Sequence, residues 1–372
     1  METLRLIEES KKYNYRVYEN NEFKQFISPK AKYIFNKHTG QMISWGEETK
    51  DDPERFPAPN IADIEITGCC TGLHNNGDVC PFCYKSNTPS SGTYMTFEEF
   101  KHIIDVYPKS LTQVALGADA CLVCNPDIWK MMEYCRAKGI IPNVTLANVL
   151  NDEIADNLVK YCGAVAISVY NDFDIAFDSV KKLTDRGRTQ VNIHLLLAEN
   201  YYERAKAVLN ARLTDPRLSK LNAIVCLGLK RKGRGSSFER MTDEHFREIV
   251  EFATNNHIGL GFDSCNSKRA LEVLGDSVKS CVIACESTLE SSYVNYKGYY
   301  HPCSFMEGEG CWKEGISLKE VTSTEDFLDK VWNHEKTLNF MESLLATTKN
   351  NCYGIGRSRI YPDGRWRADH NT

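Results

Sequence analysis

The chain has 372 residues, of which 42% are hydrophobic and 26% are charged, a composition typical of a soluble globular protein. Its 45 basic and 50 acidic residues give a net charge of −5, which argues against binding nucleic acid through a broadly basic surface. No apolar stretch is long enough to span a membrane, and the N-terminus lacks the apolar core of a signal peptide. We therefore expect a cytoplasmic protein that is large enough for more than one domain.

Residues 1–60 predict a small β-rich lead-in. The segment KYIFNKHTGQMISW, residues 32–45, favours a β-hairpin with Thr39 and Gly40 in its turn. The proline-bearing stretch DDPERFPAPN, residues 51–60, then links this lead-in to the first buried strand.

A regular alternation of strands and helices follows the lead-in. Short apolar runs, typical of strands buried on both faces, occupy residues 61–67, 112–117, 140–147, 164–170, 190–198 and 222–230. Helix-length segments with start signals separate these six runs, such as the capping box predicted for Thr96 and Glu99. A later run, GLGFDS, could add one more strand. The pattern predicts βαβ units in a parallel sheet, either open or barrel-like, with its functional groups at the C-terminal strand ends.

Fifteen cysteines are many for a cytoplasmic chain, where thiols stay reduced and dense cysteine usually indicates metal binding or catalysis. Some of them fall in apolar runs, where a buried thiol simply fills the core: Cys121, Cys124, Cys135, Cys162 and Cys226. Four others lie in CCTGLHNNGDVCPFCYK, residues 69–85, directly after the first predicted strand. A zinc ion or an iron–sulfur cluster could hold these four, and the reducing compartment disfavours a disulfide.

The strand, the cysteine loop with its CPFC sequence and the following βα units resemble the radical S-adenosylmethionine (SAM) superfamily over residues 61–264. This resemblance implies a partial parallel (βα)₆ TIM-like barrel. It also implies a [4Fe–4S] cluster bound by Cys70, Cys80 and Cys83, with Cys69 outside the ligand set. The family's usual motif is CxxxCxΦC, so the longer spacing before Cys80 indicates a loop insertion. In the family, SAM binds the fourth iron, and its reductive cleavage gives a 5′-deoxyadenosyl radical that abstracts a substrate hydrogen.

The same resemblance implies contacts to SAM at Tyr84, Gly117, Asp119, Asn148 and Ser168. Tyr84 directly follows the last cluster cysteine, and LGAD after the second strand stands where the family has a Gly-Gly-Glu-like turn. For Asn148 and Ser168, a buried or capping role competes with a contact to SAM. The basic sequence KRKGRG, residues 230–235, could be a solvated loop or could pair with a carboxylate of SAM or substrate.

Residues 265–372 break the βα alternation and hold a second group of cysteines. Cys285, followed after twelve residues by GYYHPC, resembles the CX(9–15)GX(4)C signature of SPASM and Twitch extensions, with a hairpin turn at Lys297 and Gly298. The resemblance implies an auxiliary iron–sulfur domain over residues 265–372 with a second [4Fe–4S] cluster. Its predicted ligands are Cys265, Cys285, Cys303 and Cys352, with Cys281 and Cys311 in reserve. Four thiolates also suit a structural zinc site.

The sequence thus predicts a radical SAM enzyme that modifies a ribosomally made peptide or a small molecule. Such an enzyme implies an electron donor, for example flavodoxin or ferredoxin, and neither a membrane nor bulk nucleic acid as a partner. The alternative is a non-catalytic protein that binds zinc or an iron–sulfur cluster.

Overall fold

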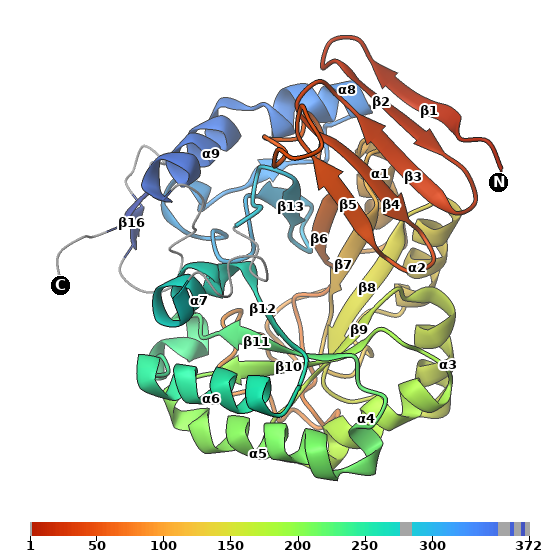
Figure 1. Ribbon diagram of the computed structural model, residues 1–372. Helices are drawn as coiled ribbons and strands as arrows, with labels where there is room; N and C mark the ends of the chain where they lie inside the picture. Colours follow the sequence, from red (N-terminus) through yellow and green to blue (C-terminus); the bar gives the residue numbers. More distant parts are fainter. Residues whose placement is uncertain (1, 276–284, 349–357, 361–365, 369–372) are drawn as a thin grey trace.

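The computed structural model describes residues 2–275, 285–348, 358–360 and 366–368 (Figure 1). The chain opens with an antiparallel sheet whose strands are in sequence order: β1 (Arg5–Ser10), β2 (Tyr15–Glu19), β3 (Phe23–Ile27), β4 (Lys32–Asn36) and β5 (Met42–Trp45). The hairpin predicted over residues 32–45 is confirmed as β4 and β5. In its turn Gly40 has a φ of +74°, a conformation that favours glycine, and donates its N–H to the Asn36 carbonyl at 2.9 Å.

This N-terminal sheet packs near the amino-terminal end of a barrel strand. The buried Lys24 ammonium donates to the Leu111 carbonyl at 2.7 Å, and the Tyr33 hydroxyl donates to the Ser110 carbonyl. Both acceptors immediately precede β7 (Gln113–Gly117). The lead-in therefore lies away from the opposite, C-terminal edge of the barrel sheet, where the site is expected.

Parallel strands follow one another in chain order across the main sheet: β6 (Ile61–Glu65), β7, β8 (Ile141–Leu146), β9 (Val165–Ser168), β10 (Val191–Leu197), β11 (Ala223–Gly228) and β12 (Leu260–Phe262). The additional strand, β12, comes from the GLGFDS run. The strand order never reverses, which excludes the doubly wound alternative. In the described part of the chain β12 does not pair with β6, so the arrangement is consistent with a partial TIM-like barrel.

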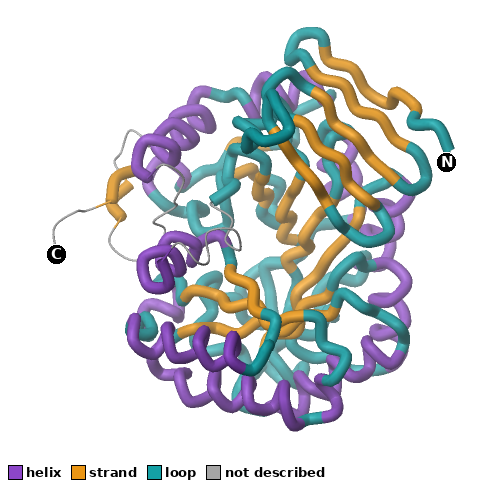
Figure 2. The backbone as a smooth tube through the Cα atoms, viewed as in Figure 1, coloured by secondary structure: helices purple, strands orange, loops and turns teal. Residues whose placement is uncertain are grey.

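Helices alternate with these strands and form an outer layer, as Figure 2 shows. They are α1 (Phe97–Val106), α2 (Ile128–Ala137), α3 (Asp152–Tyr161), α4 (Phe173–Asp185), α5 (Tyr202–Thr214) and α6 (Asp243–Asn255). The predicted capping box is confirmed at α1, where the Thr96 side chain accepts from the Glu99 N–H and the Glu99 carboxylate accepts from the Thr96 N–H. None of the described helices combines the length and apolarity that crossing a membrane requires.

The C-terminal segment returns to the barrel sheet. Its elements are α7 (Ser267–Leu274), β13 (Ser291–Val294), β14 (Tyr299–His301), β15 (Ile316–Ser317), α8 (Thr324–Phe327), a π-helical turn (Leu328–Trp332), α9 (Glu335–Thr348), β16 (Ser358–Ile360) and β17 (Trp366–Ala368). The predicted hairpin turn at Gly298, with a φ of +79°, joins β13 to β14. Strand β13 pairs in parallel with β6, so this hairpin extends the main sheet rather than standing apart from it.

The sequence predicted barrel strands that are apolar on both faces, and the structure shows that this prediction is wrong. Val114 and Val144 are buried, whereas Asp63 and Thr145 are exposed to the barrel interior, where a large cavity lies. The alternation of strand side chains thus places apolar residues under the helices and small or polar residues around the cavity.

Candidate active site

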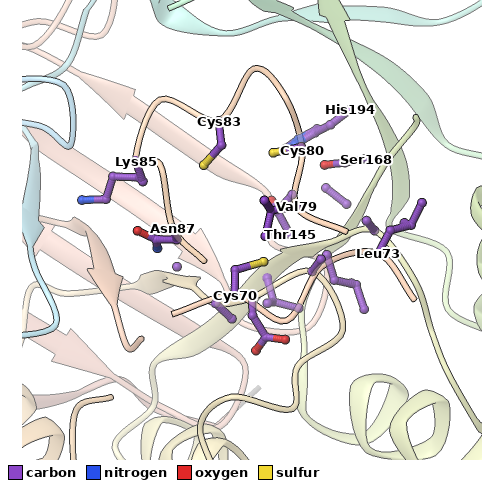
Figure 3. Close-up of a pocket in the computed structure, with 18 of the residues that line it drawn as sticks. Cys70, Leu73, Val79, Cys80, Cys83, Lys85, Asn87, Thr145, Ser168 and His194 are labelled. Carbon is purple, nitrogen blue, oxygen red and sulfur yellow. The ribbon is translucent and has the colours of Figure 1, made fainter. Parts of the chain in front are cut away.

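A cavity of about 820 Å³ opens at the C-terminal ends of the barrel strands, and the cysteine loop after β6 forms part of its wall. Cys70, Cys80 and Cys83 all line this cavity. Figure 3 shows their sulfur atoms turned towards the same space. The loop therefore brings together the three cysteines that the sequence predicted as one ligand set.

Two of these thiols are directly coupled. The Cys80 thiol donates a hydrogen bond to the Cys83 sulfur, which lowers the pKa of Cys83 to about 6 and raises the pKa of Cys80 well above its usual range. Burial raises the pKa of Cys70, partly offset by hydrogen bonds from the backbone N–H groups of Ala120 and Gly72. One thiol of the set is therefore predisposed to the thiolate form that metal ligation needs.

The three thiols suit an iron–sulfur cluster better than a single metal ion. Across the described residues, no three His, Cys, Asp or Glu side chains lie close enough to hold one ion. In a [4Fe–4S] cluster each thiolate binds a different iron, so its ligands need only surround a shared space. Cys70, Cys80 and Cys83 surround such a space on one cavity wall, and they match the thiolate donors that this cluster takes.

Cys69 points elsewhere. Its sulfur lies 3.1 Å from the Thr67 hydroxyl and also hydrogen-bonds with Cys124, and Cys69 is not among the residues that line the cavity. The adjacent cysteines thus face different surroundings.

Side chains from three neighbouring segments anchor the cysteine loop. Arg234 donates from Nε to the Cys80 carbonyl at 2.9 Å and from Nη2 to the Asn87 carbonyl at 3.0 Å. The Asn148 amide donates to the Leu73 carbonyl at 3.0 Å, and the Cys121 thiol approaches the same carbonyl at 3.2 Å. These contacts hold the loop backbone from outside the cavity.

The KRKGRG sequence is therefore mostly engaged within the protein, which neither of its two sequence interpretations predicted. Besides the contacts of Arg234, Lys230 pairs with Asp263 at 2.7 Å and Lys232 pairs with Glu309 at 3.0 Å. Gly233, with a φ of +54°, lies so close to the Tyr84 carbonyl that a Cβ atom there would clash at 2.4 Å. The sequence forms a platform for the cysteine loop.

A buried ionic network joins the cysteine loop to the first barrel strand, β6, and to the C-terminal segment. The Lys85 ammonium contacts Glu65 at 3.2 Å, donates to the Tyr293 hydroxyl at 2.7 Å and pairs with Glu307. The Tyr293 hydroxyl also donates to Glu65 at 3.0 Å. Burial raises the pKa of Glu65, although Lys85 offsets part of that effect. Lys85 is thus fully engaged by protein groups.

Of the residues predicted to contact SAM, Tyr84, Gly117, Asp119 and Ser168 line the cavity. The Asp119 carboxylate is already engaged, since it accepts the backbone N–H of Cys121, Val123 and Cys124 at 2.9–3.2 Å.

Tyr84 and Asn148 also have partners within the protein. The Tyr84 hydroxyl hydrogen-bonds Ser304 at 3.1 Å, and its ring packs on Phe305. Asn148 does not line the cavity, because its side chain is turned to the loop backbone. Asn148 can therefore act on the site through the position of the cysteine loop.

An aromatic cluster encloses the side of the cavity next to the loop. The Phe82 ring stacks on Tyr170 with centroids 5.6 Å apart and meets Tyr201 edge-on at 5.4 Å. The buried Arg204 guanidinium lies 3.5 Å from the Tyr201 ring centroid. The aromatic position of the CPFC sequence thus packs within the cavity wall and excludes water there.

Several cavity residues were missed from the sequence: Asp63, Asn143, Thr145, Asn192 and His194. Each stands in the middle of a run taken as a continuous apolar strand. The signal was the two-residue spacing of polar residues, as in IPNVTLA and VNIHLLL, which marks one face of a strand as polar.

The second cysteine group is only partly described. Cys281 and Cys352 lie outside the described residues. Cys285 is buried in the core, while Cys303 and Cys311 pack against that core. No three of the described tail cysteines form a site for a single metal ion. The auxiliary ligand set therefore stays a prediction.

No family model and no curated protein matches this chain. Among solved structures, one of Streptococcus suis SuiB matches with a TM-score of 0.62 at 10% identity, covering 90% of this chain and 95% of SuiB. The complex of SuiB with precursor peptide SuiA matches with a TM-score of 0.57 at 13% identity, and the complex with S-adenosylmethionine with 0.55 at 12%. In both complexes the match covers 76% of this chain and 66% of the SuiB chain, just under two thirds. The chain shares the fold of SuiB.

Proposed function

We propose that this chain is a radical SAM enzyme whose [4Fe–4S] cluster is held by Cys70, Cys80 and Cys83. The observation that carries the proposal is that these three thiols face one cavity at the C-terminal edge of a parallel, barrel-like sheet. Function in such sheets is located at this edge. The fold shared with SuiB, which has been solved with S-adenosylmethionine, supports the same conclusion.

When bound, the cluster would supply the electron, received from a donor such as flavodoxin or ferredoxin, that splits SAM into methionine and a 5′-deoxyadenosyl radical for hydrogen abstraction. The residues of the protein would bind and orient SAM and the substrate, and they would exclude water from the site. The backbone near Tyr84 and the turn at Gly117 and Asp119 border the space next to the thiols, where SAM would bind. Phe82 and Tyr170 close one side of that space against solvent.

We propose a peptide as the substrate, with a small molecule as the second candidate. The structure of SuiB with its precursor peptide supports a peptide, because that complex shares the fold of this chain. The cavity is of the size that ligand-binding sites have.

A non-catalytic zinc or iron–sulfur protein is the competing function, and one experiment separates the two. Protein purified without oxygen and reconstituted with iron and sulfide should be brown and should release 5′-deoxyadenosine from SAM when reduced. A colourless protein that retains zinc, or a brown one that leaves SAM intact, would refute the proposed activity.

We further propose that Cys265, Cys285, Cys303 and Cys352 hold an auxiliary [4Fe–4S] cluster. The hairpin of β13 and β14 supports this proposal, because it places Cys303 directly after β14 in the arrangement that the CX(9–15)GX(4)C resemblance implies. Four protein ligands would leave no iron open, which suits electron transfer or structure.

A further inference from the structure

Polar side chains without partners stand on four strands of the barrel wall. They are Asp63 on β6, Thr145 on β8, Ser168 on β9 and His194 on β10, and all of them line the cavity. None makes a side-chain hydrogen bond or ion pair within the described structure. Figure 3 shows Thr145, Ser168 and His194 around the cavity that the cluster-loop cysteines also line. A barrel interior is normally filled by packed apolar side chains, so this wall is built for a ligand.

Strand register explains why there is room beside Asp63. Its neighbours across the sheet are Ala115 on β7 and Tyr293 on β13. Ala115 is small, and the Tyr293 hydroxyl is directed to Glu65 and Glu307. The Asp63 carboxylate therefore faces open cavity, and it is exposed there. Enclosure by the barrel wall raises the pKa of Asp63 to about 6, which reflects the cost of a carboxylate without a counter-ion.

The other carboxylates that line the cavity already have partners. Glu65 pairs with Lys85, and Asp119 accepts three backbone N–H groups. Asp172 caps α4 by accepting the Asp174 N–H, and Asp78 accepts from the Asn76 amide. In the described lining, Asp63 is the carboxylate left without a partner.

The charge of the cavity favours a cation. Five carboxylates line it, against the two basic side chains of Lys85 and Arg204. Lys85 lies in its ionic network, and Arg204 stacks on the Tyr201 ring and lies near Phe82. Neither provides a counter-ion for Asp63.

We infer that Asp63 is the counter-ion for an amine or guanidinium group of the substrate, and that Thr145 and His194 offer hydrogen bonds to the substrate from the same cavity wall. This inference rests on the proposed function, because it assigns the substrate class of the same cavity. It places the cationic group within the barrel, below the three thiols. A substrate with a lysine-like or arginine-like side chain meets this requirement.

The test is equilibrium binding of butylamine, with butanol and butyrate as uncharged and anionic probes, to the reconstituted full-length protein. Calorimetry or saturation-transfer NMR measures the affinity with and without SAM. Butylamine should bind more tightly than either other probe. Asp63→Asn should weaken butylamine binding roughly tenfold or more, because it removes one partner of an enclosed charge pair.

Asp172→Asn is the matched control. It makes the same change of charge in the same cavity, and asparagine caps a helix as well as aspartate does. It should leave butylamine binding within about twofold of wild type. An equal loss in both variants would overturn the inference, since the overall negative charge of the cavity, and not Asp63 itself, would then account for binding. Loss of butylamine binding when SAM is added would overturn it as well, because Asp63 would then belong to the SAM site.

Folding and cofactor chemistry are followed separately. Asp63→Asn removes a carboxylate without partners, so its thermal midpoint should equal or exceed that of wild type. A lower midpoint would show that Asp63 has a structural role, contrary to the inference.

Cleavage of SAM by the wild-type protein tests the proposed function alone. Intact cleavage together with butylamine binding that does not depend on Asp63 would refute this inference and leave the proposed function standing.

Discussion

The two cysteine groups of this protein differ in how far local sequence determines their geometry. The thiols of Cys70, Cys80 and Cys83 come from one loop, and that loop is anchored by side chains from three other segments. The tail cysteines are spread over nearly ninety residues, and their positions depend on how a long segment folds back onto the barrel. Close spacing in sequence therefore predicts a site well when tertiary contacts fix the loop, whereas dispersed cysteines demand a knowledge of the whole fold.

The largest effect is expected when the loop ligands are removed one at a time. Cys70→Ala, Cys80→Ala and Cys83→Ala should each abolish formation of 5′-deoxyadenosine from SAM, since each leaves an iron without its thiolate. Cys69→Ala is the matched control on the adjacent residue, and it should retain cleavage because its thiol faces Thr67 rather than the cavity. Product is measured by chromatography after reduction with dithionite. Loss of activity in Cys69→Ala with activity retained in Cys70→Ala would show that the ligand assignment is wrong.

The tail group is tested by counting iron. The reconstituted wild-type protein should hold about eight irons per chain, and the triple variant of Cys70, Cys80 and Cys83 should hold about half of that. The double variant Cys285→Ala, Cys303→Ala should likewise keep about four irons, now in the loop cluster, and should still cleave SAM. Iron is measured by mass spectrometry with zinc determined alongside. If the wild-type protein holds about four irons and one zinc, the tail cysteines bind a structural zinc ion and the proposal of an auxiliary cluster is wrong.

Much of the fold could be predicted because its signals are local. Apolar runs and helix caps place most of the strands and helices, and Thr96 with Glu99 forms the expected capping box. The polar face of the barrel was missed because polar residues such as Asp63 and Thr145 alternate with apolar ones inside runs that were interpreted as apolar throughout. Whether such a residue faces water, a core or a cavity depends on the curvature of the sheet, which no single strand encodes.

The contacts that hold the loop could not be predicted either. Arg234 lies 147 residues from Asn87 in the sequence, and Lys85 lies 208 residues from Tyr293 and 222 from Glu307. A basic sequence such as KRKGRG has the same composition whether it is solvated or packed under a loop. The basic sequence packs under the loop because β11, β13 and β6 belong to one sheet, in which their C-terminal ends lie at the same edge.

A smaller effect is expected from Arg234, which distinguishes an anchored loop from one ordered by its cluster alone. Arg234→Gln removes the guanidinium donors to the Cys80 and Asn87 carbonyls. Hydrogen bonds from a charged group contribute about 1.5–3 kcal/mol each, so the loss of two should lower the free energy of unfolding by about 3 kcal/mol or more. Urea unfolding of the protein before reconstitution measures this change, and iron content after reconstitution should fall in parallel.

Arg231→Gln provides the control for that measurement. Arg231 belongs to the same basic sequence and carries the same charge, but it is exposed and its side chain makes no hydrogen bond or ion pair within the described structure. Its substitution should change the free energy of unfolding by less than about 0.5 kcal/mol. Equal effects of the two variants would show that the charge of the sequence matters and that the contacts of Arg234 do not.

The smallest expected effect concerns one of the hydrogen bonds that join the two regions, between the Tyr84 hydroxyl and the Ser304 hydroxyl at 3.1 Å. Tyr84 follows a loop cysteine and Ser304 follows a tail cysteine, so this bond links the two cysteine groups through half-buried side chains. Tyr84→Phe and Ser304→Ala should each lower the free energy of unfolding by about 1 kcal/mol. If the bond accounts for both losses, the double variant should cost no more than the larger single loss, with a coupling energy of about 1 kcal/mol. Strictly additive losses in urea unfolding would mean that the loop and the tail are held together by packing and by the Lys85 network instead.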